Sequence, residues 1–246
     1  MPWNWDSVAD TYEERKEQGP GRGAYRLKNA ITAALLCRHL DGHVGQALDA
    51  GGGTGLWSRF LAKRGWKVHL LDFSEGMLKV ARRKLEDEAL SDKVQTVQGD
   101  ICDLSRFDDQ SFDLVFAEGS PLSYCEDSAK ALRELFRVCR KGGWLFASVE
   151  SRLSNIEPDA KRAVSWEQVS GVLNSGYFQR DPKDPADRIR SFWPEEWTAL
   201  LQSAGWKVEM VYSKAILPRY LGLETINRLI ESEGVRLSEL VAQELK

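Results

Sequence analysis

Between residues 46 and 149, short apolar segments of strand length alternate with longer segments whose apolar residues recur at a helical period. The strand-like segments are 47–50, 67–72, 94–98, 112–117 and 144–149, and the helix-like segments are 56–64, 74–89 and 128–140. Such alternation builds right-handed βαβ units, which place parallel strands in one sheet with helices on both faces. The sequence therefore predicts an α/β fold with a doubly wound, mostly parallel, Rossmann-like sheet.

The pattern outside this stretch divides one predicted domain, 1–246, into regions. Residues 24–41 have the apolar period of a helix. The alternation stops after Glu150 and resumes with a helix over 195–204 and a strand over 206–212. We therefore predict an N-terminal cap and first helix at 1–44, a cofactor-binding core at 45–150, an inserted lid at 151–192, and a C-terminal part of the sheet with a helical tail at 193–246.

The composition narrows the range of partners. The net charge of −3 gives the chain no broad basic surface to collect phosphates, so nucleic-acid binding is disfavoured. No apolar run approaches the roughly 18 residues that cross a bilayer. The four cysteines and three histidines have no metal-ligand spacing. We expect a cytoplasmic protein with reduced cysteines, no metal and no membrane partner.

A glycine-rich loop follows the first predicted strand, with glycines at 51, 53 and 55. Glycine lets the backbone turn sharply and approach a ligand, and the next helix begins with N–H groups that have no partner within the helix. A dinucleotide fingerprint would place its third glycine at position 56, where this chain has Leu56, and the Gly-Lys-Ser/Thr of a phosphate loop is absent. Asp49, two residues before the first glycine, is unsuited to a pyrophosphate but suits a cationic ammonium group.

The segment Asp49-Ala50-Gly51-Gly52-Gly53-Thr54-Gly55 resembles the first motif of class I S-adenosylmethionine-dependent methyltransferases, D/E-x-G-x-G-x-G. The resemblance covers 45–150 and extends to 193–212. It implies S-adenosylmethionine as the cofactor and a seven-stranded sheet. The chain departs from the family at Gly52, where a cysteine is usual, and in its last strand, for which 213–218 is the only candidate segment.

The resemblance also implies roles for residues at the ends of the next strands. Asp72 would accept hydrogen bonds from both ribose hydroxyls, and Asp100 would accept one from the adenine amino group. The full set of cofactor contacts implied by the resemblance is Asp49, Gly51, Gly53, Gly55, Asp72, Phe73, Met77, Asp100, Ile101 and Glu118. Met77 is equally compatible with an ordinary core position, and Glu118 with an exposed turn.

The segment from Trp5 to Tyr12 resembles the entry segment of the ubiquinone and menaquinone methyltransferase branch. No nucleophile–base motif is present, and an activated methyl group needs mainly alignment and exclusion of water. Tyr12 and Tyr124 are the candidates for lining the methyl-transfer site. Residues 1–30, with aromatic side chains on a glycine-rich backbone, and the insert 151–192 are the candidate lid over the acceptor. The aromatic side chains and cations of the insert suit a planar or anionic acceptor, and a purely structural lid stays an open alternative. These residues are Trp166, Tyr177, Phe178, Phe192, Arg152, Arg180, Arg188 and Arg190.

The predicted function is methyl transfer from S-adenosylmethionine to a small-molecule acceptor. A non-catalytic sensor or assembly protein that binds the same cofactor would have the same binding motifs, so that alternative stays open. An NAD-dependent oxidoreductase is disfavoured by Leu56. The sequence indicates neither the acceptor, nor the atom methylated, nor the oligomeric state.

Overall fold

The computed structural model describes residues 4–40, 42–152, 166–179, 188–214, 216–231 and 236–245. The chain divides into two compact units, each described by itself below. The first consists of residues 1–9 and 45–209, and the second of residues 10–44 and 210–246. The region boundaries expected from the sequence stay predictions.

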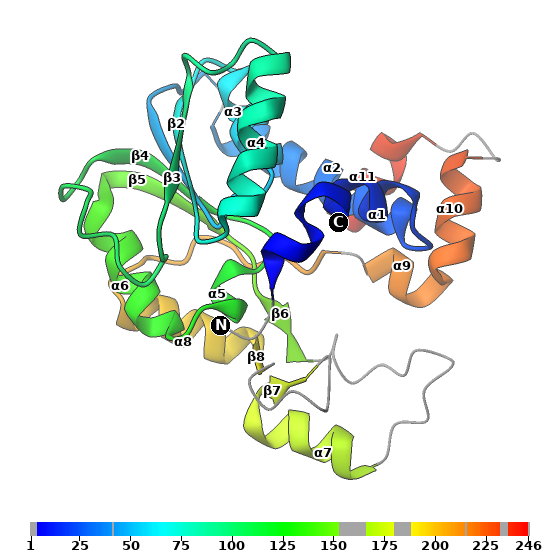
Figure 1. Cartoon of the computed structure of the whole chain (residues 1–246). Helices are drawn as coiled ribbons and strands as arrows, with labels where there is room; N and C mark the ends of the chain where they lie inside the picture. The colour runs from blue at the N-terminus through cyan, green and yellow to red at the C-terminus, as the bar shows by residue number, and fades with distance from the viewer. Residues whose placement is uncertain are drawn as a thin grey trace. The chain divides into compact units, whose positions relative to one another are not determined.

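A five-stranded parallel sheet forms the centre of the first unit (Figure 1). Its order is β3-β2-β1-β4-β5, with β1 at Gln46–Ala50, β2 at Lys67–Asp72, β3 at Val94–Gln98, β4 at Phe112–Ala117 and β5 at Cys139–Ala147. The chain runs outward from β1 to β3 and then returns to the other side of β1 as β4. This reversal is the switch point at which doubly wound sheets bind ligands, so the predicted topology is confirmed.

Helices cover both faces of this sheet, as the contacts of successive side chains along β4 show. Phe116 meets the ring of Trp57, on α3 (Leu56–Ala62), at a centroid distance of 5.4 Å. Its neighbours Val115 and Ala117 lie instead in a buried cluster with Leu132 and Leu135 of α6 (Ser128–Val138). Successive residues of a strand face opposite sides, so α3 and α6 cover opposite faces. The remaining helices after the strands are α4, Glu75–Asp87, and the short α5, Pro121–Tyr124.

The predicted insert contains a second, three-stranded sheet of order β6-β8-β7, with β6 at Glu150–Ser151, β7 at Tyr177–Phe178 and β8 at Ile189–Phe192. Its helix is α7, Trp166–Ser175, and α8 follows at Pro194–Ser203. The guanidinium of Arg152 is buried, donates to the carbonyl of Leu173 at 2.8 Å and pairs with Glu196. Phe192 is buried in the main core. The side chains of Arg152 and Phe192 therefore hold the insert in place. They are not available to an acceptor, contrary to the expectation from the sequence. Arg180 lies outside the described residues.

The predicted sixth and seventh strands are absent from the described part of the chain. Residues 206–212 have no ladder partner, although the indole N–H of Trp206 donates to the carbonyl of Leu132 at 3.2 Å and Val208 packs on the core. The alternation of half-buried and exposed residues over 206–209 comes from this packing on α6 rather than from pairing with β5. The candidate segment 213–218 runs into the helix α9, Ile216–Leu221.

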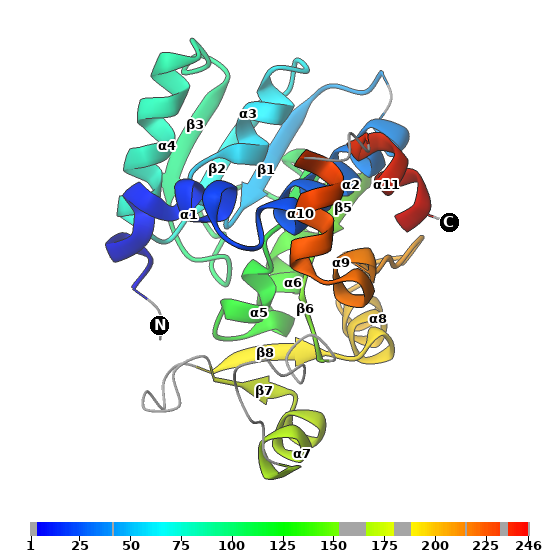
Figure 2. The ribbon, with the colours of Figure 1, turned by 90° about the vertical axis from the view of Figure 1, so that its right-hand side faces the viewer.

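The second unit is helical, as its apolar periods predict. It contains α1 (Tyr12–Gln18), α2 (Arg22–His39), α9, α10 (Leu223–Glu231) and α11 (Leu237–Glu244), and α2 packs against α10 and α11 (Figure 2). Asn227 joins these helices, because its side-chain oxygen accepts from the N–H of Gly23 at 2.8 Å and its amide donates to the carbonyl of Pro20 at 2.8 Å. None of the helices in the described residues has the length and apolarity needed to cross a membrane.

Candidate cofactor site at the carboxyl edge of the sheet

The glycine loop after β1 has backbone conformations that only glycine adopts without strain. Gly51 and Gly53 have φ angles of 78° and 55°. A Cβ atom at Gly51 would lie 2.5 Å from the ring of Pro121, so the loop passes close to the start of α5. A Cβ atom at Gly53 would meet nothing within 4 Å, so this residue faces open space that a ligand can occupy.

Asp49 lies near the end of β1 with 1% of its surface exposed. One carboxylate oxygen accepts a 2.6 Å hydrogen bond from the hydroxyl of Ser58, on α3. Burial raises the pKa of Asp49 to about 7, with smaller contributions from the charges of Asp72 and Glu118. A Cβ atom at Gly52 would lie 2.7 Å from this carboxyl group, so the loop passes close to the Asp49 side chain.

Asp72 ends β2 and is held by the backbone on both carboxylate oxygens. Oδ2 accepts from the N–H of Gly53 at 2.8 Å, and Oδ1 accepts from the N–H of Ser74 at 2.9 Å. Burial raises the pKa of Asp72. Since a carboxylate oxygen accepts more than one hydrogen bond, both oxygens keep capacity for the two hydroxyls of a diol.

The candidate adenine contacts lie after β2 and β3. Met77 is buried on the first turns of α4, Phe73 is half-buried just before that helix, and Ile101 is buried in the main core. The carboxylate of Asp100 accepts from the N–H of Cys102 at 2.8 Å, which fixes the turn after β3. The structure therefore gathers these predicted residues at the same edge as Asp49 and Asp72, because all five strands are parallel.

The acidic groups at this edge select the charge of a ligand. Asp49, Asp72, Asp100 and Glu118 stand at or next to the carboxyl ends of β1 to β4. Such a group of carboxylates repels phosphates and attracts cations. An S-adenosylmethionine molecule carries a cationic sulfonium and a cationic ammonium, so the residues present fit this cofactor.

The loop after β4 has a positioning residue that the sequence did not indicate. The hydroxyl oxygen of Ser148 accepts from the N–H groups of Gly119 and Ser120 at 3.0 and 3.1 Å. Ser120 has a φ of 66°, which is uncommon for a residue other than glycine. Ser148 therefore stabilises a strained turn beside Glu118, after β4.

The N-terminal residues reach the same edge through contacts that the sequence also did not indicate. The carboxylate of Asp6 accepts from the hydroxyl of Ser74 and from the N–H of Gly76, each at 2.6 Å, and the Ser74 hydrogen bond lowers the pKa of Asp6. Trp5 meets the ring of Tyr124 edge to face at 5.6 Å. The first turn of the helix η1 (Trp5–Thr11) thus links the residues after β2 with those after β4. Tyr12 lies in the second unit, so its role at the methyl-transfer site stays a prediction.

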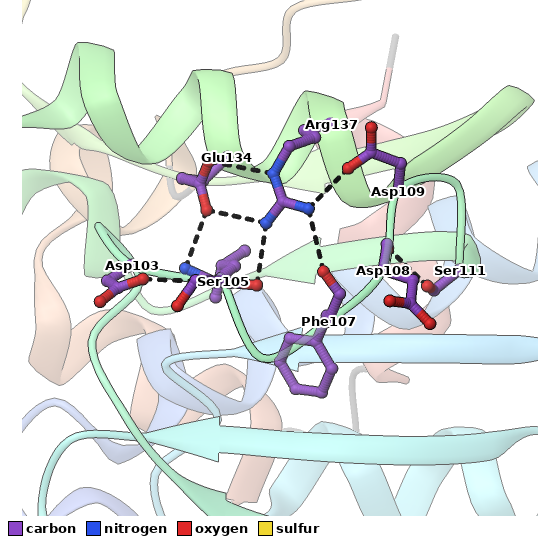
Figure 3. Close-up of polar contacts among 9 residues, drawn as sticks. Asp103, Ser105, Phe107, Asp108, Asp109, Ser111, Glu134 and Arg137 are labelled. Carbon is purple, nitrogen blue, oxygen red and sulfur yellow. Dashed lines mark hydrogen bonds and ion pairs between the residues drawn. The ribbon is translucent and has the colours of Figure 1, made fainter.

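The loop that follows Asp100 is anchored on α6 by Arg137 and Glu134 (Figure 3). The guanidinium of Arg137 donates to the carbonyl oxygens of Phe107 and Leu104 at 2.9 and 2.8 Å, and pairs with Glu134 and Asp109. Glu134 in turn accepts from the N–H of Leu104 at 2.9 Å, and its hydrogen bond with Arg137 lowers its pKa. This network fixes the loop between Asp100 and β4.

Comparisons with known proteins agree with this geometry. A family model described as a methyltransferase domain matches residues 47–143. The demethylmenaquinone methyltransferase of Clavibacter sepedonicus is 45% identical over 96 residues, 39% of this chain and 37% of the relative. The demethylmenaquinone methyltransferase of Thermobifida fusca (strain YX) is 32% identical over 209 residues, 82% of this chain and 84% of the relative. The chain thus spans little more than a third of one relative and most of the other.

A solved structure shows the same fold. The S-adenosylmethionine-dependent methyltransferase from Mesorhizobium loti superposes with a TM-score of 0.61 at 22% identity, over 83% of this chain and 95% of that one. The match to the Thermobifida relative covers most of both chains. With the glycine loop and the acids at the strand ends, these similarities show that the chain belongs to the class I S-adenosylmethionine-dependent methyltransferases.

Proposed function

We propose that this enzyme transfers a methyl group from S-adenosylmethionine to a small, hydroxylated aromatic acceptor of the quinone-precursor type. The observation that carries methyl transfer is the set of carboxylates at the ends of β1, β2 and β3, next to the open face of Gly53. The aromatic acceptor is supported by the names of the two demethylmenaquinone methyltransferases to which the chain is similar.

Each polar group would have a separate task. Asp49, in its ionised form, would accept from the cofactor's ammonium group, and Asp72 would accept from both ribose hydroxyls. Asp100 would accept from the adenine amino group, while Met77 and Ile101 supply apolar walls. The cofactor, when bound, supplies an activated methyl group on a sulfonium, so the protein needs chiefly to align donor and acceptor and to exclude water.

The acceptor would approach from the side of β4 and β5, because cofactor contacts occupy the ends of β1 to β3. Glu118 and Tyr124 would then face it, with the turn held by Ser148 between them. We propose that the N-terminal residues of the first unit and the insert cover this opening. Within the insert, the exposed Trp166 and Tyr177, the latter beneath the guanidinium of Arg188 at 4.4 Å, are the candidate lid contacts.

The test is turnover by the purified protein with S-adenosylmethionine and a panel of acceptors, followed by mass spectrometry of the products. We expect S-adenosylhomocysteine to form with reduced hydroxylated benzoquinones or naphthoquinones and not with aliphatic carboxylates. Asp72→Ala, which should bind the cofactor more weakly, is the control and should turn over more slowly at limiting cofactor. Cofactor binding without turnover on any acceptor would favour the sensor alternative.

Hydrogen exchange tests the lid: residues 166–179 should gain protection when cofactor and acceptor are both present, and strong protection without ligand contradicts the lid proposal.

A further inference from the structure

Two cysteines lie at the junction of the cofactor and acceptor sides of the site. Cys102 follows Ile101 in the turn after β3, and Cys125 follows Tyr124 at the end of α5. The Cys102 thiol, 5% exposed, donates to the carbonyl of Asp127 at 3.4 Å, only two residues beyond Cys125. The Cys125 thiol is half-buried, donates to the carbonyl of Leu122 at 3.5 Å and packs against the same apolar cluster as Cys102.

The two thiols also interact. When Cys102 ionises, the S–H of Cys125 can donate to its sulfur instead of to the Leu122 carbonyl, which lowers the pKa of Cys102 and raises the pKa of Cys125, so Cys102 is the more readily ionised of the two. The thiolate is the reactive form of cysteine. By contrast, burial raises the pKa of Cys139 to about 11, and its thiol lies 3.9 Å from the carbonyl of Trp144.

We propose that Cys102 and Cys125 are a modification site at which a hydroperoxide forms a reversible disulfide between the turn after β3 and the end of α5. The Cys102 thiolate attacks one peroxide oxygen, the O–O bond breaks, and a sulfenic acid and one water form when hydrogen peroxide is the oxidant. The Cys125 thiol then attacks the Cys102 sulfur, the S–O bond breaks, and a second water leaves. In total two thiols are oxidised to one disulfide while one hydrogen peroxide is reduced to two waters.

The disulfide would act on the cofactor site through Asp100. The backbone N–H of Cys102 donates to the Asp100 carboxylate at 2.8 Å, so moving Cys102 toward Cys125 disturbs the residue assigned to the adenine amino group. The same movement removes the thiol hydrogen bonds to the Asp127 and Leu122 carbonyls, since a disulfide sulfur carries no proton. Oxidation should therefore weaken cofactor binding, and reduction should restore it.

The experiment treats the full chain with hydrogen peroxide, maps disulfides by peptide mass spectrometry, and titrates S-adenosylhomocysteine by calorimetry before oxidation, after it, and after dithiothreitol. We expect a disulfide joining the peptides with residues 102 and 125, and a Kd raised about fivefold, the effect of losing one hydrogen bond, that returns to its first value on reduction. Cys139→Ser should behave like the wild type. Cys125→Ser and Cys102→Ala should each abolish both effects, and their thermal unfolding shows whether they are folded.

Absence of the 102–125 disulfide under excess peroxide overturns the proposal, and so does a disulfide that leaves the Kd unchanged. Neither measurement uses methyl transfer, so they separate this proposal from the choice of acceptor.

Discussion

The backbone N–H of Gly53 donates a 2.8 Å hydrogen bond to the carboxylate of Asp72, which ties the glycine loop after β1 to the end of β2. The N–H of Ser74 holds the other oxygen at 2.9 Å. Asp72 therefore points toward the open face of the loop before any ligand binds, and its orientation costs nothing at the moment of binding.

Replacing Asp72 by Ala should lower the affinity for S-adenosylhomocysteine by at least about tenfold, because hydrogen bonds to a charged acceptor contribute about 1.5–3 kcal/mol each. Asp72→Asn should fall between, since it keeps one acceptor oxygen. Calorimetry measures both, with Asp103→Ala, which removes an exposed carboxylate in the loop after β3, as the control. Wild-type affinity in Asp72→Ala would refute the ribose assignment.

Ionising Asp49 in the cofactor-free protein should cost stability. Its folded pKa is raised from 3.8 to about 7, so the unfolded chain loses this proton first as the pH rises. The contribution of protonated Asp49 to the free energy of unfolding is fully present below about pH 4, decreases between about pH 4 and 7, and is lost above the folded pKa. Asp49→Asn should remove this loss, which is on the order of a few kcal/mol, and raise the Tm at pH 8 while weakening cofactor binding.

Thermal unfolding of the cofactor-free protein from pH 5 to 8 tests this effect, with the exposed Asp92→Asn as the control that should follow the wild type. A Tm profile of Asp49→Asn that is parallel to the wild-type profile would show that Asp49 is already ionised at low pH.

Asp6 and Gly76 should act as one unit in cofactor binding. A Cβ atom at Gly76 would lie 2.7 Å from the Asp6 carboxylate oxygen that caps α4, so Gly76→Ala displaces Asp6 much as Asp6→Ala removes it. Each change should weaken S-adenosylhomocysteine binding several-fold, because Ser74 loses its acceptor beside Asp72. The double variant should be no weaker than the worse single one. Additive losses would mean that the two residues act separately.

Arg137 should contribute more to stability than its partly exposed position suggests. Its guanidinium donates to two carbonyls of the loop after β3 and forms ion pairs with Glu134 and Asp109 (Figure 3). Arg137→Ala should therefore destabilise the fold by about 2 kcal/mol or more, since it leaves several acceptors without a donor. Asp109, whose side chain is 69% exposed, is the matched control, and Asp109→Ala should cost less than about 1 kcal/mol. Urea unfolding compares them, and equal losses would contradict the proposed anchoring.

The sequence predicts the parts of the site that depend on neighbours along the chain. Asp49, Asp72 and Asp100 stand at or just after the ends of apolar strands, and the resemblance to the methyltransferase family implies their roles. The roles of Asp6 and Ser148 cannot be predicted in this way, because their partners lie 68 and 28 residues away and neither residue belongs to a periodic pattern. The strand expected at 206–212 fails for a related reason: alternating burial reports contact with a core but does not specify pairing with another strand. The role expected for Arg152 beside the acceptor fails because its partner Glu196 lies 44 residues farther along the chain.

Ser148→Ala should separate acceptor turnover from cofactor binding. The Ser148 hydroxyl is the acceptor for the N–H groups of Gly119 and Ser120, and the positive φ of Ser120 depends on such support. Its loss lets the turn beside Glu118 relax, on the side of the sheet away from Asp72 and Asp100. We therefore expect kcat to fall about tenfold or more with the acceptor, because misplacement of a reacting partner is costly, while the Kd for S-adenosylhomocysteine stays within about twofold. Ser148→Thr, which keeps the hydroxyl, should retain more activity than Ser148→Ala. A Kd that rises in parallel with the loss of kcat would place Ser148 in support of the cofactor rather than of the acceptor.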